Sequence, residues 1–241
     1  MILRETEGRT MIGIIAAMKV EAEGLISEMK YKRTRVISGV EFTRGKLRGK
    51  DAVVCVCGVG KVRAAVCAEA MATNYKPDCI INTGVAGNLS KELGIGDIAI
   101  GKDAVQHDFD TTAFGDPRGG CFIDGKFETY FKCDRKLVKL VEKAAKAEGL
   151  RSVTGTVATG DCFVAGNDKK DEIRGYFPTA VCCEMEGGAI AVVSFINKIP
   201  FAIVRAISDS ADGESPENFS GFLEQAAGNS IRVIMRVVEE L

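Results

Sequence analysis

The sequence has a single histidine, His107, and no CxxC pair among its nine cysteines. One histidine excludes a metal site built on two histidines and leaves a single candidate for a histidine-dependent triad. An odd number of cysteines without CxxC spacing gives little support to a disulfide framework or a zinc knuckle. Most of these cysteines lie in apolar stretches, where free cysteine behaves as a small buried hydrophobe in a reducing compartment. Acid–base chemistry in this chain therefore falls to carboxylates.

The chain also lacks an excess of charge of either sign and any long apolar run. Its 32 Lys and Arg residues are matched by 33 Asp and Glu residues, so the formal net charge is −1. This balance argues against a protein that binds nucleic acid or a membrane by electrostatics. No apolar stretch approaches the roughly 20 residues of a membrane span, and charged residues stand at the start of the chain, where a signal peptide would be apolar. We expect a cytoplasmic protein.

Apolar residues, by contrast, make up 46% of the 241 residues. A chain of this length buries roughly 70% of its unfolded surface, which suffices for one large core. Short apolar runs typical of strands alternate with helical patterns, and no Ser-, Pro- or Gly-rich linker separates them. This alternation predicts an α/β fold, in which a single three-layer domain has a mixed, mostly buried β-sheet flanked by helices.

The individual elements are read from apolar periodicity and from turn residues. Strands are predicted at residues 11–17, 33–39, 41–47, 51–57, 78–84, 96–101, 152–160, 180–184 and 201–208. Helices are predicted at 19–30, 61–75, 134–149, 167–176, 187–197 and from about 217 to 241. Asp134 is expected to cap the third of these helices. Residues 107–132 show no clear periodicity.

Acidic residues and glycines follow the ends of five predicted strands: Glu21, Gly84–Gly87, Asp161, Glu184 with Glu186, and Asp209. Open α/β sheets bind ligands beyond the carboxyl ends of their strands, so these residues could converge on one pocket. Several carboxylates there would suit general acid–base chemistry on a neutral substrate. Alternatively, each acidic residue caps a helix or lies in the first turn of one. This explanation is adequate for any single acidic residue, but it is weaker for the whole set.

The glycine-rich segment CGVGKVR at residues 57–63 fits neither nucleotide-binding motif. A Walker loop needs Gly where Cys55 stands and Ser or Thr where Val62 stands. The dinucleotide fingerprint needs a third Gly where Arg63 stands. We interpret this segment as a glycine turn that enters a helix.

Seven segments occur in this order: MIGIIAAMKVEAEGL, CGVGKVRAA, KPDCIINTGVAGNL, HDFDTTAFG, ATGDCFV, CCEMEGGAIA and VRAISDSAD. Together they resemble the methylthioadenosine/S-adenosylhomocysteine nucleosidases of the nucleoside phosphorylase superfamily. The resemblance runs from about residue 11 to the C-terminus. It implies one nucleoside phosphorylase-like domain at 11–241 and leaves 1–10 as an N-terminal extension. No metal or organic cofactor is implied.

The resemblance implies that water cleaves the N-glycosidic bond of 5′-methylthioadenosine and S-adenosylhomocysteine, giving adenine and a thioribose. By position, Asp209 matches the general acid that protonates adenine, and Glu21 matches the residue that orients and deprotonates water. Glu186 matches the carboxylate that binds the ribose hydroxyls. Independently of the family, cleavage builds positive charge on the sugar and negative charge on the base, so this placement stabilises both ends.

Further site residues are carried over from the same segments. Met185 would lie against the sugar, Phe163 would stack on adenine, and the Val164 backbone would read the base edge. Ser208 and Arg205 would support Asp209 and the carboxylate cluster. The remaining expected positions are Phe219, which helps to exclude water, and Gly87, near the water site. Apolar residues of this kind are also common in cores.

Hydrolysis and phosphorolysis are distinguished by the residues around a phosphate site. Related phosphorylases place an Arg and a Ser or Thr beside the glycine turn that here runs from Asn82 to Gly87. This chain has Asn82 and Val85, neither of which can hold a phosphate, so hydrolysis is favoured. Related nucleosidases have Ser at the position of Val85, so the sequence does not define the water network there. A phosphorylase and a non-catalytic adenosine sensor remain the alternatives.

His107 lies in the segment QHDFDTTAFG, which also contains Phe114. The resemblance implies that this segment helps to form a homodimer and that Phe114 gives an apolar cover to the partner's 5′-alkylthio pocket. From the sequence alone, a single histidine is more often structural than catalytic.

Overall fold

The structure is a computed structural model that describes residues 10–209 and 216–241, with side chains described at 10–209 and 222–241. The N-terminal extension expected at 1–10 therefore lies almost wholly outside the described residues. Strands are β1 Met11–Ala16, β2 Lys30–Ile37, β3 Val40–Leu47, β4 Lys50–Val56, β5 Cys79–Asn88, β6 Ile98–Gln106, β7 Cys121–Ile123, β8 Lys126–Glu128, β9 Phe131–Lys132, β10 Ser152–Thr159, β11 Ala180–Glu184 and β12 Phe201–Asp209. Helices are α1 Lys19–Glu28, α2 Lys61–Tyr75, the 3₁₀ helix η1 Thr112–Phe114, α3 Arg135–Ala147, α4 Asn167–Tyr176, α5 Gly187–Ile196 and α6 Pro216–Glu240.

In the described part of the chain, ten strands form one mixed sheet, whose main path is β11-β10-β6-β12-β5-β1-β4-β3-β2, with β9 on β6. The centre is parallel, because β1 pairs in parallel with β4 and β5, and β12 pairs in parallel with β5. The β2–β3–β4 segment is antiparallel, and β12 is antiparallel to β6. The predicted mixed sheet is confirmed.

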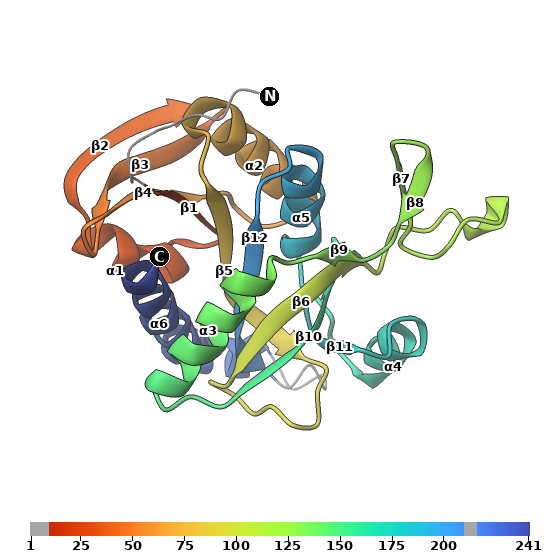
Figure 1. Cartoon of the computed structure of the whole chain (residues 1–241). Coiled ribbons are helices and arrows are strands. Elements are labelled where there is room, and N and C mark those ends of the chain that lie inside the picture. Colours follow the sequence, from red (N-terminus) through yellow and green to blue (C-terminus); the bar gives the residue numbers. More distant parts are fainter. Residues whose placement is uncertain (1–9, 210–215) are drawn as a thin grey trace.

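Helices cover both faces of this sheet, which gives the three predicted layers (Figure 1). Neighbouring strand residues enter opposite cores: Ile15 and Ile80 pack in the core formed with α2 and α5, whereas Ile14 and Ile81 pack in the core formed with α1, α3 and α6. Central strands buried on both faces explain the continuous apolar runs of the sequence. No helix in the described part of the chain is long and apolar enough to cross a membrane.

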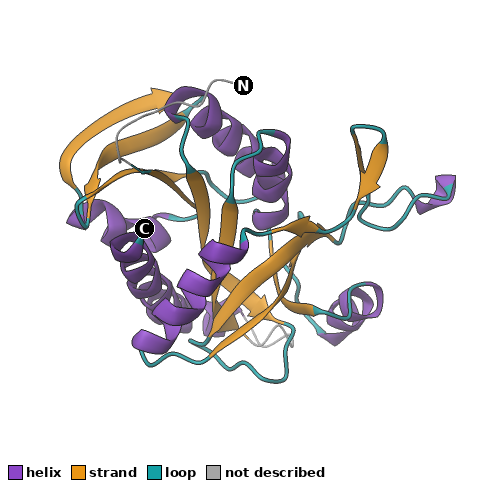
Figure 2. Ribbon diagram, viewed as in Figure 1, coloured by secondary structure: helices purple, strands orange, loops and turns teal. Residues whose placement is uncertain are grey.

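Most predicted elements match the structure closely. Helix α2 spans the predicted residues 61–75, and the side chain of Asp134 caps α3 by accepting hydrogen bonds from the N–H groups of Lys136 and Leu137. Seven of the nine cysteines are buried free thiols, and Cys121 and Cys162 are partly buried free thiols. Residues 107–132 form η1, the β7–β8 hairpin and β9, and part of this segment projects from the body of the molecule (Figure 2).

The sequence predicted a strand at 78–84 and a glycine turn from Asn82 to Gly87, and the prediction of a turn is wrong. All of these residues belong to β5, which runs to Asn88. The extension is held because β12 pairs along it and β11 pairs in antiparallel orientation with Gly87 and Asn88. Such pairing across long sequence separations leaves no local signal, so glycine is easily misread as a turn.

Candidate active site

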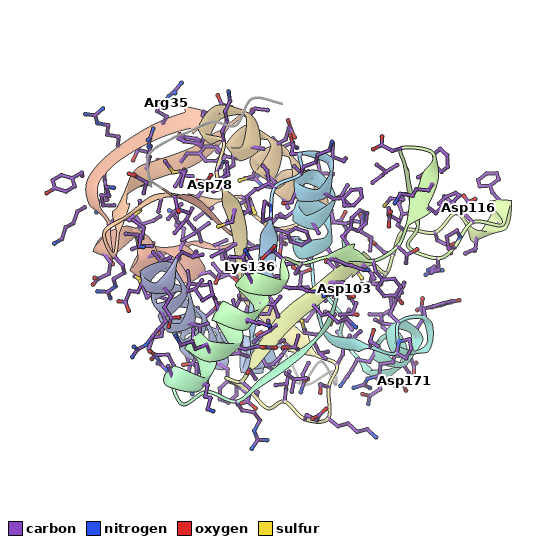
Figure 3. The ribbon with its side chains drawn as sticks, in the orientation of Figure 1. Arg35, Asp78, Asp103, Asp116, Lys136 and Asp171 are labelled. Atoms are coloured by element: carbon purple, nitrogen blue, oxygen red, sulfur yellow. The ribbon has the colours of Figure 1, made fainter. Side chains whose placement is uncertain are left out.

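One cavity of about 230 Å³ opens where α1 and the ends of β5, β11 and β12 meet. The side chains of Arg35, Asp116 and Asp171 lie at the periphery of the molecule, as is usual for charged groups (Figure 3). The cavity, by contrast, is lined by several carboxylates that are buried. It is lined by Ala17, Met18, Glu21, Val59, Val85, Ala86, Gly87, Phe163, Cys183, Glu184, Met185, Glu186, Ser208 and Asp209.

Glu21 is a buried carboxylate in the first turn of α1. Its Oε2 accepts hydrogen bonds from the backbone N–H groups of Ala17 (2.9 Å) and Met18 (2.7 Å), and its Oε1 accepts one from Val85 (3.0 Å). Burial raises the pKa of Glu21, and the positive charge of Arg205 and these three N–H groups oppose that rise. Glu21 therefore both caps its helix and faces the cavity, so the two interpretations of this acid are compatible.

Gly84 on β5 makes room for the Glu21 carboxylate. A Cβ atom at Gly84 would lie 2.8 Å from Glu21 Oε1, closer than the atoms can approach without displacement. The glycine is thus required by the position of a side chain that is 63 residues away in sequence, and not by a turn. This close approach brings β5 and α1 together at the cavity wall.

Glu186 is buried at the N-cap position of α5. Its Oε1 accepts a hydrogen bond from the Gly60 N–H group at 2.8 Å. Burial, followed by repulsion from Glu184, raises the pKa of Glu186 to about 7, against the attraction of Arg205. Glu186 can therefore exchange a proton near neutral pH.

Arg205 is fully buried on β12, and its contacts lie within the carboxylate cluster. Its Nη2 donates to Glu184 Oε2 at 2.5 Å and also to Asn82 Oδ1, while its Nη1 donates to the Val204 carbonyl. Sequence reasoning proposed Glu184 only as one of several strand-end acids and examined Asn82 only as a phosphate ligand. Their shared contact with a buried guanidinium is a tertiary feature without a local signal.

Asp209 ends β12 opposite Gly87 on β5. Ser208 Oγ donates a hydrogen bond to Asp209 Oδ2 at 3.0 Å, and the Ser208 side chain is fully buried. The structure thus places Ser208 beside the Asp209 carboxylate.

The loop between β10 and α4 carries Phe163 and Val164 to a small hollow of about 30 Å³, which shares Met185, Asp209 and Gly87 with the main cavity. Phe163 is 58% exposed and lines both the small hollow and the main cavity. Val164 is buried. The predicted stacking residue, base-edge residue and sugar contact are therefore brought together around one continuous opening.

A polar clamp ties this loop to the N-terminus of α2. Asp161 Oδ1 accepts a hydrogen bond from the Lys61 N–H group, in the first turn of α2, at 2.7 Å. Asp161 is neither the N-cap nor a first-turn residue of the helix that follows it, because α4 begins at Asn167 after the N-cap Gly166. Asp108 joins the two residues, because it accepts from the Asp161 N–H group at 2.8 Å and pairs with Lys61 Nζ at 2.7 Å. The clamp thus connects the loop that carries Phe163 to the start of α2.

Phe114 and His107 do not line this cavity, and the side chain of Phe219 is not among those described. Phe114 is 86% exposed on η1 and does not line the cavity of its own chain. His107 is buried against Gly160, its ring nitrogens have no partner among the described residues, and burial lowers its pKa. Phe219 belongs to α6, but its side chain lies outside the described residues.

The charged side chains that line the cavity, among the described residues, are all acidic. Four carboxylates line it, from Glu21, Glu184, Glu186 and Asp209, and among the described residues no Lys or Arg does. A phosphate ion needs charge-assisted donors, and such a wall would repel it. The arrangement suits a neutral substrate on which both positive and negative charge develop.

Comparison with known proteins identifies the family. The family profile described as "Phosphorylase superfamily" matches residues 11–239. The 5′-methylthioadenosine/S-adenosylhomocysteine nucleosidase of Shewanella loihica is 38% identical over 95% of this chain and 99% of its own length. The chain belongs to this nucleosidase family. The member from Actinobacillus succinogenes is 39% identical over the same shares of the two chains.

Solved structures of related hydrolases have the same fold as the present chain. The enzyme from Neisseria meningitidis, in complex with methylthio-immucillin-A, has a TM-score of 0.92 and 36% identity over 96% of this chain and all of its own. The futalosine hydrolase of Helicobacter pylori has a TM-score of 0.90 and 29% identity over 98% of this chain and all of its own. The nucleoside phosphorylase-like fold predicted from the sequence is therefore confirmed.

Proposed function

We propose that this protein hydrolyses the N-glycosidic bond of 5′-methylthioadenosine and S-adenosylhomocysteine, releasing adenine and the thioribose. The observation that carries the proposal is the meeting of Asp209, Glu21 and Glu186 around one cavity that no described Lys or Arg lines. The names of its relatives support the same activity. We propose 5′-deoxyadenosine as a further substrate, because it shares adenine and ribose and differs only at the 5′ end.

The three carboxyl groups act at different ends of the bond. Asp209 protonates the adenine ring, so that the base leaves as a neutral molecule. Glu21 removes a proton from the attacking water, a task favoured by its raised pKa. Glu186 accepts hydrogen bonds from the ribose hydroxyls while positive charge develops on the sugar. Each acid or base contributes about 10²- to 10⁴-fold, and electrostatics and positioning supply the rest.

Binding residues hold the substrate in the reactive geometry. Phe163 stacks on adenine, the Val164 backbone reads the base edge, and Met185 contacts the sugar beside Gly87. Their places around the shared opening support these roles. Ser208 and Arg205 position Asp209 and the carboxylate cluster, respectively, and Phe219 excludes water. Fixing the reactants in this way lowers the entropic part of the barrier.

We propose that the protein works as a homodimer in which Phe114 covers the partner's 5′-substituent. The exposure of Phe114, together with that of Phe122 on β7, supports an apolar contact made by this projecting segment. Sedimentation velocity should give a dimer, and a monomer at assay concentration would contradict this proposal. We further propose that residues 11–241 form the catalytic domain in the cytoplasm, which its free thiols support.

The purified protein should release adenine and methylthioribose from 5′-methylthioadenosine at the same rate with and without inorganic phosphate. The reason is that no described cation lines the cavity to hold phosphate. Mass spectrometry of the products tests this expectation. Product that forms only with phosphate, as a sugar phosphate, would show a phosphorylase. Binding of the nucleoside without cleavage in either tube would show a sensor.

A further inference from the structure

The buried cluster beside the cavity contains more negative than positive groups. Glu21, Glu184 and Glu186 are all buried around a single buried guanidinium, that of Arg205. If all four groups were ionised, the cluster would carry a net charge of −2 in an environment where unpaired charge is costly. How Arg205 is shared among the three carboxylates therefore decides which of them can exchange protons.

The sharing is unequal, because Arg205 makes its salt bridge with Glu184. The Nη2 atom lies 2.5 Å from Glu184 Oε2 and also donates to Asn82, whose own Nδ2 donates to the Ile15 carbonyl at 3.0 Å. Asn82 and Glu184 thus hold the same guanidinium nitrogen. Glu21 and Glu186 interact with Arg205 only through the longer-range field.

Both carboxylate oxygens of Glu184 accept further hydrogen bonds. Its Oε2 accepts hydrogen bonds from the backbone N–H groups of Glu186 (3.0 Å) and Gly187 (2.7 Å), and its Oε1 accepts one from the Thr159 hydroxyl. A Cβ atom at Gly187 would lie 3.1 Å from Glu184 Oε1, so the glycine permits this close approach. One carboxylate therefore joins β10, β12 and the start of α5.

We propose that Glu184 is a positioning residue, which holds Arg205 away from Glu186 and Glu21 and fixes the loop that carries Glu186. This inference rests on the proposed function, since Glu186 and Glu21 are the groups that would act on ribose and water. Glu184 neutralises the guanidinium, and the other two carboxyl groups remain able to take up and release protons.

Within the described part of the chain, titratable and charged groups reach Glu186 from several elements, and the Gly60 N–H group donates to it. Glu21 faces it from α1, Glu184 from β11 and Arg205 from β12, and Cys57 faces it from the segment after β4. Burial raises the pKa of the Cys57 thiol far above its usual range, so this group stays neutral throughout the pH range of an assay. Changes in the protonation of Glu186 therefore depend on the two carboxylates and Arg205.

Glu184→Gln tests the inference, because it removes the charge but keeps the shape and one hydrogen-bond acceptor. Without its counter-ion, Arg205 interacts more strongly with Glu186 and Glu21, and repulsion from Glu184 is lost as well. Both effects lower the pKa of Glu186, which we expect to fall by about one unit or more from its value near 7. The acidic limb of the profile of kcat/KM against pH should move to lower pH by the same amount. At the plateau, kcat/KM should fall about ten- to a hundredfold.

The protonation of the carboxyl groups can be followed without substrate by NMR of protein labelled with ¹³C at the glutamate carboxyl carbon. Glu184→Asp keeps the charge and should leave the titration and the pH profile close to those of the wild type, although its rate falls. Glu148→Gln is the matched control, because Glu148 pairs with Arg232 and Arg236 on the surface, away from the cavity. It should change neither measurement.

An unchanged carboxyl titration in Glu184→Gln, with a lower rate at all pH values, would show a merely structural role and overturn the inference. If Glu184→Gln does not fold, Asn82→Ala releases Arg205 Nη2 from its second acceptor instead, so the guanidinium is freer to approach Glu186 and the titration should shift in the same direction by less. If no shift occurs there either, the inference fails. If the titration shifts as expected but wild-type protein releases no adenine, the charge arrangement is correct and the proposed function is wrong.

Discussion

We expect Asp209→Asn to lower kcat on 5′-methylthioadenosine by about 10²- to 10⁴-fold while the affinity for the nucleoside stays nearly unchanged. Asparagine has almost the same shape as aspartic acid and can still accept the hydrogen bond that Ser208 donates to Asp209. It cannot supply a proton to the adenine ring. The variant therefore separates proton donation from binding. Single-turnover kinetics and calorimetric titration with the substrate measure the two effects.

Asp103→Asn is a suitable control for this variant. Asp103 is also buried, but it lies on β6, accepts a hydrogen bond from the Thr156 hydroxyl and does not line the cavity. It should have near wild-type kcat, whatever its effect on stability. An Asp209→Asn protein with near wild-type kcat would contradict the assignment of the general acid. Equal losses in kcat and in affinity would indicate damage to the pocket instead.

Glu21→Gln should also reduce kcat by about 10²- to 10⁴-fold, because an amide cannot take a proton from water. A second effect comes from the surroundings of this side chain. Both carboxylate oxygens of Glu21 accept backbone N–H groups, from Ala17, Met18 and Val85. A glutamine has one acceptor oxygen, so its NH₂ group must face at least one N–H donor. We expect a loss of about 1–3 kcal/mol in the free energy of unfolding.

Gly84→Ala changes the position of Glu21 without changing its chemistry. The added methyl group would meet Glu21 Oε1 at 2.8 Å and displace the carboxylate. We expect a smaller loss of kcat than for Glu21→Gln, with the substrate affinity largely kept. Rates and denaturant unfolding, measured on both variants, separate lost chemistry from lost stability. Full activity in both variants would show that Glu21 has no part in the reaction.

Local patterns predicted most of the secondary structure. The helix expected at 61–75 is α2, and the strands expected at 11–17 and 180–184 are β1 and β11, with the former one residue shorter. Periodicity and caps are properties of consecutive residues, and they can be read without knowing the fold. The strand predicted at 78–84 ends too early, because the rest of β5, up to Asn88, is set by its pairing with β11 and β12.

The candidate site was predicted only in part, for a related physical reason. Glu21, Glu186 and Asp209 each follow a strand, and parallel strands bring such residues to the same edge of a sheet. Ser208 and Arg205 were expected to support Asp209 and the carboxylate cluster, but the sequence did not indicate that the salt bridge of Arg205 is with Glu184. The choice of partner depends on distances between side chains from different strands, and sequence spacing does not contain those distances.

The sequence by itself determined the α/β class, the position of most elements, the family and the carboxylate character of the site. These follow from periodicity, from composition and from motifs of neighbouring residues. The tertiary structure alone decided that Arg205 is buried between Glu184 and Asn82, and that Gly84 makes room for Glu21. It also decided which carboxyl group has its pKa raised to about 7, that of Glu186. Burial and Coulomb interactions act through space, so they arise only when distant segments are packed together.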